Sequence, residues 1–90
     1  MAVVVPAHNE EKLIAETIRG IPQFVDRIYV VDDRSTDGTI EAVRALVDPR
    51  VVLLEHERNL GVGGAIITGY LKARDDRIDV TAVMAADAQM

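Results

Sequence analysis

The sequence of 90 residues contains no cysteine and no tryptophan, and it has only one phenylalanine and two tyrosines. Without cysteine the chain can form neither a disulfide framework nor a thiolate metal site, which fits a reducing compartment. Apolar residues make up 49% of the chain, which supports a packed core although aromatic residues contribute only 3%. A chain of this length forms one small domain or part of one.

The sequence also lacks a basic stripe and a long apolar run. Its formal net charge is −5, which argues against a nucleic-acid partner because phosphate binders carry clustered lysine and arginine. No apolar stretch approaches the length that crosses a bilayer. The first residues have neither the basic flank nor the cleavage site of a signal peptide. We therefore expect a cytoplasmic location and no nucleic-acid partner.

Apolar segments of strand and helix periodicity alternate along the chain. The strand-like segments are residues 2–5, 27–32, 51–54 and 79–84. The helix-like segments are residues 10–19, 38–47 and 62–74. The order β-α-β-α-β-α-β with short connections predicts an α/β fold with a Rossmann-like open parallel sheet, right-handed crossovers and helices on both faces.

Polar residues at the segment boundaries predict where the helices begin and how one of them packs. Asn9 is expected to cap the helix over residues 10–19, and Asp37 or Thr36 the helix over residues 38–47. Gly69 lies inside the third helix, where it costs about 1 kcal/mol in helix propensity, and we interpret it as a site of close packing.

Three of the apolar runs open into acidic loops. The run at residues 28–31 is followed by Asp32 and Asp33, and successive strand residues point to opposite faces, so only one of them can face a given ligand. A carboxylate there can accept a hydrogen bond from a base N–H or a ribose hydroxyl, although turns and helix caps also favour aspartate. Because ligands of open α/β sheets bind beyond the carboxyl ends of the strands, three such loops would face one crevice suited to a nucleotide and a divalent metal.

The first and last acidic loops add further candidates. Glu10 sits at the start of a predicted helix, where the dipole already favours a carboxylate. His8 could stack on or bond a base, or be an ordinary exposed histidine. Asp87 and Gln89 could share a hard cation with phosphate oxygens and water, although two ligands alone make a weak site.

Glycines at positions 61, 63 and 64 precede the third helix. Such glycines can let a phosphate approach a helix N-terminus. The spacing fails the dinucleotide-binding fingerprint because Ile66 stands where the third glycine belongs, and it lacks the Gly-Lys-Ser/Thr ending of a P-loop. Tight turns and close helix packing explain these glycines better.

Four motifs in this order resemble those of the family-two glycosyltransferases of the GT-A fold. The resemblance is strongest to the branch of dolichol-phosphate mannose synthase and the polyprenyl-phosphate glycosyltransferases, and it covers the whole chain. The matching segments are Val5-Pro6-Ala7-His8-Asn9-Glu10-Glu11 with Ile21-Pro22 and Val25-Asp26, Val30-Val31-Asp32-Asp33 with Ser35-Thr36-Asp37-Gly38-Thr39, Asn59-Leu60-Gly61-Val62-Gly63-Gly64-Ala65 with Gly69, and Met84-Ala85-Ala86-Asp87-Ala88-Gln89-Met90.

This resemblance implies a transferase that uses a nucleotide-diphosphate sugar, UDP- or GDP-linked, with Mg²⁺ or Mn²⁺ and a polyprenyl phosphate acceptor. It places the full-length protein in the cytoplasm, at the cytoplasmic membrane face. The implied nucleotide-binding residues are Pro6, His8, Glu10, Val31, Asp33, Ala86 and Asp87. The implied metal ligands are Asp87 and Gln89.

The chain departs from the family pattern at Ala85, where the Asp-x-Asp metal motif would have its first acid. In inverting members of the family the catalytic base lies well beyond the metal motif, so no residue of this chain is assigned that role. We interpret residues 1–90 as the N-terminal, donor-binding part of a single GT-A domain, with the acceptor-binding part absent. We expect the 90 residues alone not to transfer sugar. The exposed sheet edge of such a part gives it a route to self-association.

Two alternatives compete with this interpretation. A receiver domain would need a phosphoacceptor aspartate after the third strand, where this chain has Glu55-His56-Glu57. The alternative that stays open is a degenerate domain, lacking the acid at Ala85, that binds a nucleotide or a protein without catalysis. Metal-dependent binding of a nucleoside diphosphate would favour the transferase, and binding that ignores a chelator would favour the degenerate domain.

Overall fold

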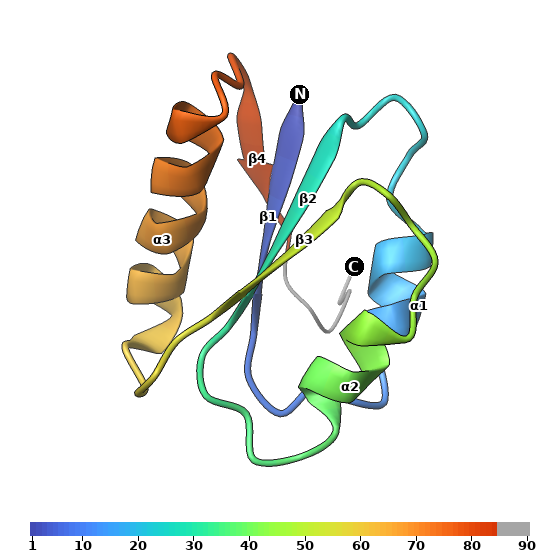
Figure 1. The fold of residues 1–90 in the computed structure, drawn as a ribbon, viewed down its shortest axis with the longest axis vertical. Helices are drawn as coiled ribbons and strands as arrows, with labels where there is room; N and C mark the ends of the chain where they lie inside the picture. Colours follow the sequence, from blue (N-terminus) through green and yellow to red (C-terminus); the bar gives the residue numbers. More distant parts are fainter. Residues whose placement is uncertain (85–90) are drawn as a thin grey trace.

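Four parallel strands form the centre of the computed structural model, which describes residues 1–84 (Figure 1). The strands are β1 (Ala2–Ala7), β2 (Arg27–Asp32), β3 (Val51–Glu55) and β4 (Thr81–Val83). Their order across the sheet is β3-β2-β1-β4, and every neighbouring pair is parallel. The predicted α/β class with an open parallel sheet is confirmed.

Three helices cover the two faces of this sheet. The short helices α1 (Ile14–Arg19) and α2 (Thr39–Arg44) lie on one face, and the longer helix α3 (Gly61–Asp75) lies on the other (Figure 1). Within residues 1–84 no helix has both the length and the apolar content needed to cross a membrane.

Alternation of side chains along the two central strands builds two apolar clusters. The cluster under α1 and α2 takes the odd residues of β1 and the even residues of β2, as in Val5 and Val30. The cluster under α3 takes the opposite set, including Val4, Tyr29 and Val31. Period-two alternation in strands buried on both faces explains why these segments are apolar without interruption.

The end of β1 differs from the prediction, because the strand continues through Pro6 to Ala7. Even-numbered residues of β1 bond towards β4: Ala2 N–H donates to Val80 O at 2.8 Å, and Met84 N–H to Val4 O at 3.0 Å. The missing N–H of Pro6 therefore falls on the β4 side, beyond the Val4–Val83 pair that ends the described ladder. Proline is tolerated there because it removes no bond from the β1–β2 ladder.

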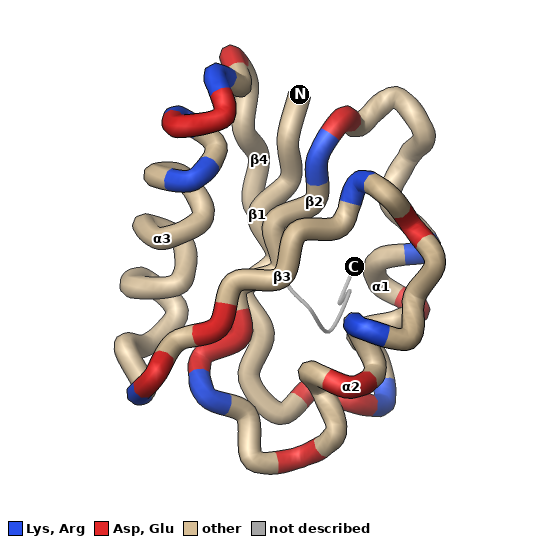
Figure 2. The backbone as a smooth tube through the Cα atoms, in the orientation of Figure 1, with Lys and Arg blue, Asp and Glu red and all other residues tan. Residues whose placement is uncertain are grey.

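The strand order reverses direction at one point of the sheet. From β1 the chain first moves outward through β2 to β3, and α3 then returns it to the other side of β1. The order therefore reverses between β1 and β4, and open α/β sheets bind ligands at such a switch point. Ala7, Asp32 and Glu55 are register partners, so three strands end level with one another, and Figure 2 shows acidic residues along this edge.

Candidate functional site

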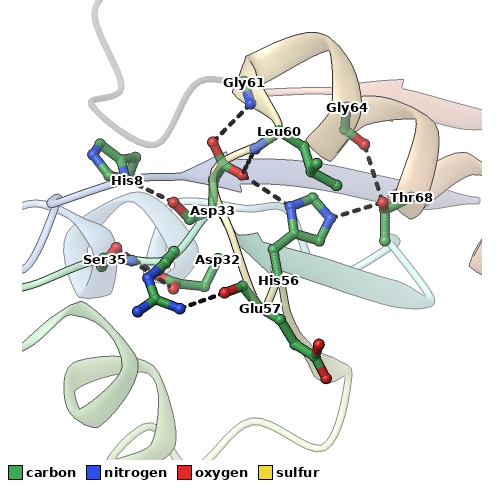
Figure 3. Close-up of polar contacts among 11 residues, drawn as sticks. His8, Asp32, Asp33, Ser35, His56, Glu57, Leu60, Gly61, Gly64 and Thr68 are labelled. Atoms are coloured by element: carbon green, nitrogen blue, oxygen red, sulfur yellow. Dashed lines mark hydrogen bonds and ion pairs between the residues drawn. The ribbon is translucent and has the colours of Figure 1, made fainter.

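Asp33 joins three segments at the tip of β2. Its residue surface is only 6% exposed, its N–H donates to Ala7 O at 2.8 Å, and its carbonyl accepts a bond from His8 Nδ1 at 2.8 Å. Its carboxylate accepts bonds from three donors in the segment that leads from β3 to α3 (Figure 3). These are His56 Nδ1 at 2.9 Å, Leu60 N–H at 2.7 Å and Gly61 N–H at 2.9 Å.

These bonds make Asp33 the cap of α3. Leu60 is the N-cap residue of α3 and Gly61 its first residue, and backbone donors at this end of a helix lack helical partners. Gly61 has φ of 79°, a left-handed conformation that glycine adopts without strain and that lets the chain turn into the helix beneath the carboxylate. Asp33 therefore satisfies two of the donors at the α3 N-terminus, and its negative charge disfavours a phosphate group there.

The electrostatics of Asp33 follow from these contacts. Burial alone would raise the pKa of the Asp33 carboxyl, but the bonds from His56, Leu60 and Gly61 outweigh burial and hold its pKa below the usual range. The group is thus an anion at neutral pH and can act only as a hydrogen-bond acceptor.

Asp32, the other half of the acidic pair, points to the opposite face. Its Oδ2 accepts the Ser35 N–H at 2.9 Å and its Oδ1 accepts the Ser35 hydroxyl at 2.5 Å. The expectation that only one of the two aspartates can face a given ligand agrees with this split, because Asp32 holds the loop that leads to α2 while Asp33 holds α3.

Side chains of the loop after β2 hold the backbone of the loop after β1. Three successive N–H groups donate to them: Asn9 to Ser35 Oγ at 2.9 Å, Glu10 to Thr39 Oγ1 at 2.8 Å, and Glu11 to Asp37 Oδ2 at 3.4 Å. Asp37 also accepts bonds from the N–H and the hydroxyl of Thr39. Burial opposes ionisation of Asp37, but the bonds from Thr39 and Glu11 prevail and lower its pKa. The loop that presents Glu10 is therefore fixed by its neighbour.

The predicted N-cap role of Asn9 is wrong. Helix α1 begins at Ile14 after Leu13, and no side chain caps it. Asn9 instead has φ of 54° and its Oδ1 accepts the Thr36 N–H at 2.8 Å, so it links two loops. The prediction for α2 holds in part: the residue before the helix is Gly38, but the Asp37 carboxylate does accept the Thr39 N–H.

Glu10 differs from the other acidic residues of this edge. Its N–H is bonded, yet within residues 1–84 its carboxylate has no hydrogen bond or ion pair. It lines a cavity of about 250 Å³ together with neighbours on its own loop and Asp37. A carboxylate on a fixed backbone, in a half-buried residue that lines a cavity, can accept bonds from a ligand hydroxyl or N–H.

The remaining predicted site residues fall into two groups. Pro6 and Val31 are register partners in the sheet, and the Val31 side chain is fully buried under α3. His8 is exposed at the end of β1, beside Asp33. Ala86, Asp87 and Gln89, together with Ala85, lie outside the described residues. The assignments of all these residues to a nucleotide or metal stay predictions.

The described residues do not by themselves fit a metal ion. Among residues 1–84 there is no group of three histidine, aspartate or glutamate side chains placed to share a cation. Asp32, Asp33 and Asp37 instead accept hydrogen bonds within the fold, as described above.

Sequence reasoning missed the contribution of His56. Its imidazole is 9% exposed and lies between Asp33 and Thr68 Oγ1, which is 2.8 Å from Nε2 (Figure 3). Thr68 also donates to Gly64 O at 3.0 Å. The available signal was a lone histidine directly after a strand, and its partners are 23 and 12 residues away, so no local rule finds them.

The strand order and the polar loops at its reversal place the chain in the class of Rossmann-like α/β domains that bind ligands beyond their strand ends. The sequence model of the family named Glycosyl transferase family 2 matches residues 2–90, and the chain belongs to this family. The resemblance drawn from the four motifs is confirmed at that level.

Similar proteins include lipid-phosphate glycosyltransferases and a solved mannosyltransferase. A UDP-N-acetylglucosamine–dolichyl-phosphate N-acetylglucosaminyltransferase of Methanococcus voltae is 33% identical over 102 residues, which cover 97% of this chain and 41% of that protein. The dolichyl-phosphate β-glucosyltransferase ALG5C of Trichomonas vaginalis is 38% identical over 88 residues, covering 83% and 26%. The mannosyltransferase PcManGT from Pyrobaculum calidifontis, solved with GDP-Man and Mn²⁺, matches with a TM-score of 0.77 at 31% identity, covering 96% of this chain and 27% of that one. The chain thus spans well under half the length of the relatives it matches.

Proposed function

We propose that the full-length protein transfers a sugar from a nucleotide-diphosphate sugar to a polyprenyl phosphate, and that residues 1–90 form its donor-binding half. The reaction takes place at the cytoplasmic face of a membrane and uses Mg²⁺ or Mn²⁺. Family membership supports the reaction type, and the named substrates of the relatives support the choice of donor and acceptor.

One observation carries this proposal for the chain itself. After the end of β1, beside the reversal of strand order, Glu10 lines a cavity and its backbone N–H is held by Thr39, while its carboxylate has no partner among residues 1–84. In this proposal Glu10 accepts bonds from the nucleotide, and Asp33 accepts one from the base. His8, Pro6 and Val31 border the same edge of the sheet.

The metal belongs to the diphosphate end of the donor. A divalent ion neutralises charge that develops on a diphosphate leaving group. In the proposal its protein ligands are Asp87 and Gln89, and Ala86 borders the same end of the nucleotide. Residues 1–84 bind and orient the nucleoside, and among them no group of three histidine, aspartate or glutamate side chains is placed to hold the ion without Asp87 and Gln89.

Calorimetry of UDP and GDP binding to the full-length protein tests the nucleotide site. Glu10→Gln is expected to weaken binding of the better ligand by about tenfold or more, since a hydrogen bond to a charged group contributes about 1.5–3 kcal/mol. Glu41→Gln is the matched control, because Glu41 is an exposed glutamate on α2. Equal affinities for the two variants would contradict the assignment of Glu10.

A transfer assay separates catalysis from binding alone. The full-length protein is incubated with a labelled nucleotide sugar, polyprenyl phosphate and Mn²⁺ or Mg²⁺, with EDTA in a parallel sample. Labelled lipid that forms only with metal supports the proposal. Nucleotide binding that is insensitive to EDTA, with no transfer, would favour the degenerate domain.

A further inference from the structure

The Asp33 carboxylate has nearly exhausted its capacity to accept hydrogen bonds. A carboxylate offers about four acceptor positions, two on each oxygen. Both positions of Oδ1 are used, by His56 Nδ1 at 2.9 Å and by Leu60 N–H at 2.7 Å. Oδ2 accepts Gly61 N–H at 2.9 Å, and no other donor among residues 1–84 bonds it, which leaves one position for a ligand.

The fold fixes this arrangement. Leu60 and Gly61 donate through their backbone N–H groups at the start of α3, so these two bonds are set by the course of the chain, including the left-handed turn at Gly61. His56 is the side-chain donor, and its imidazole is set by Thr68 on the far side. Because the Asp33 side chain is 9% exposed, the carboxylate cannot swing into solvent to free its second oxygen.

We infer that Asp33, with His56 as its positioning residue, selects a uridine nucleotide over a guanosine nucleotide. This inference rests on the proposed function, in which Asp33 accepts a bond from the base. Uracil presents a single ring donor, N3–H, which matches the single open position on Oδ2. Guanine presents two adjacent donors, N1–H and the 2-amino group, which pair with a carboxylate only when both oxygens are open.

Guanine is therefore left with one donor unpaired in a buried site, or it must displace His56 or Leu60 from Oδ1. Either outcome costs affinity, because a desolvated polar group without a partner is unfavourable. His56 is thus a specificity-determining residue through its effect on Asp33, without touching the nucleotide itself. A variant that lacks its Nδ1 donor reopens one position on Oδ1.

The test compares dissociation constants for UDP and GDP by calorimetry on the full-length protein, at one fixed Mn²⁺ concentration. The two ligands share ribose and diphosphate, so the ratio of their constants reports on the base. It is also insensitive to any fraction of unfolded protein, because both ligands see the same folded fraction. The wild-type protein is expected to bind UDP about tenfold or more tightly than GDP.

Two variants then test His56. His56→Leu removes the donor, and the UDP preference should fall below about threefold as GDP gains a second acceptor. His56→Asn keeps an N–H at the place of Nδ1 and should retain the preference. A wild-type protein that binds GDP as tightly as UDP overturns the inference while the proposed nucleotide site stands. An unchanged ratio in His56→Leu overturns the role of His56, and the absence of binding to either nucleotide overturns both proposals.

Discussion

Replacing Gly69 by alanine tests the close contact between α3 and the sheet. A Cβ built on Gly69 lies 2.7 Å from Val4 Cγ2 and 3.1 Å from Val4 Cβ, with Val4 Cγ1 closer still. Val4 is fully buried in β1, which has a strand on each side, so it has no room to withdraw. Alanine at position 69 therefore forces the helix or the strand to move.

The magnitude follows from two opposing effects. Overpacking a well-packed core costs about 1–3 kcal/mol, and alanine gains about 1 kcal/mol over glycine in helix propensity. We expect Gly69→Ala to destabilise the fold by about 0–2 kcal/mol. Gly63 lies in the same helix with nothing within 4 Å of its added Cβ, so Gly63→Ala should stabilise by up to about 1 kcal/mol. The difference between the two variants isolates the packing cost, about 1–3 kcal/mol.

Urea unfolding monitored by circular dichroism measures both variants against the wild type. Adding Val4→Ala to Gly69→Ala provides a further check, because removing the clashing methyl groups should make the Gly69 change cost at least about 1 kcal/mol less than it does alone. Equal stabilities of Gly69→Ala and Gly63→Ala would refute the reasoning, since they would show that the sheet and α3 separate freely.

Two further predictions concern pH. Burial, and after it the hydrogen bond and the charge of Asp76, raise the pKa of Tyr29 to about 12. The folded state therefore keeps a proton that the unfolded state loses from pH 10 upward, and the free energy of unfolding should fall by roughly 2–3 kcal/mol between pH 10 and 12. Urea unfolding of Tyr29→Phe should lack this pH-dependent loss. Hydrogen bonds lower the pKa of Asp33, so its stabilising effect is complete above the unfolded pKa of about 3.9 and is lost as the pH falls through the folded value. Acid titration of Asp33→Asn should therefore show a weaker loss of stability than the wild type below about pH 4. An unchanged profile would contradict the bonding described.

The sheet could be predicted from the sequence because burial on both faces demands unbroken apolar runs. The strand over residues 27–32 matches β2 residue for residue, and the interpretation of Gly69 as a packing site is confirmed by its contact with Val4. The helices were less predictable: residues 10–19 contain only the six-residue helix α1, and residues 38–47 only α2. Helical periodicity marks which residues face the core, but it does not reveal where loops compete for the terminal turns.

The wrong cap at Asn9 and the further role of Asp37 share one physical cause. Asn9 and Asp37 are polar residues just before helices, and local rules treat them as caps. In the structure Asn9 Oδ1 instead accepts the Thr36 N–H. Asp37 does accept the Thr39 N–H at the start of α2, but it also accepts the Glu11 N–H, and these two contacts between loops span 27 and 26 residues. The same limitation hid His56, whose role depends on its bond to Asp33, a residue at the end of the neighbouring strand. A single sequence shows the donors and acceptors but not the register that brings them together.

The acidic residues of the carboxyl edge therefore divide by how many of their acceptor positions the fold already uses. Asp33 holds the start of α3, so a change there alters both stability and the ligand site, and a loss of binding in Asp33→Asn would have two causes. Glu10 has its backbone fixed and its carboxylate without a partner among residues 1–84, so its substitution changes the ligand site with little cost to the fold. Affinity measurements on Glu10 variants thus report on ligand recognition. Those on Asp33 variants need a parallel measurement of unfolding, because a loss of binding there can come from the loss of the α3 cap alone.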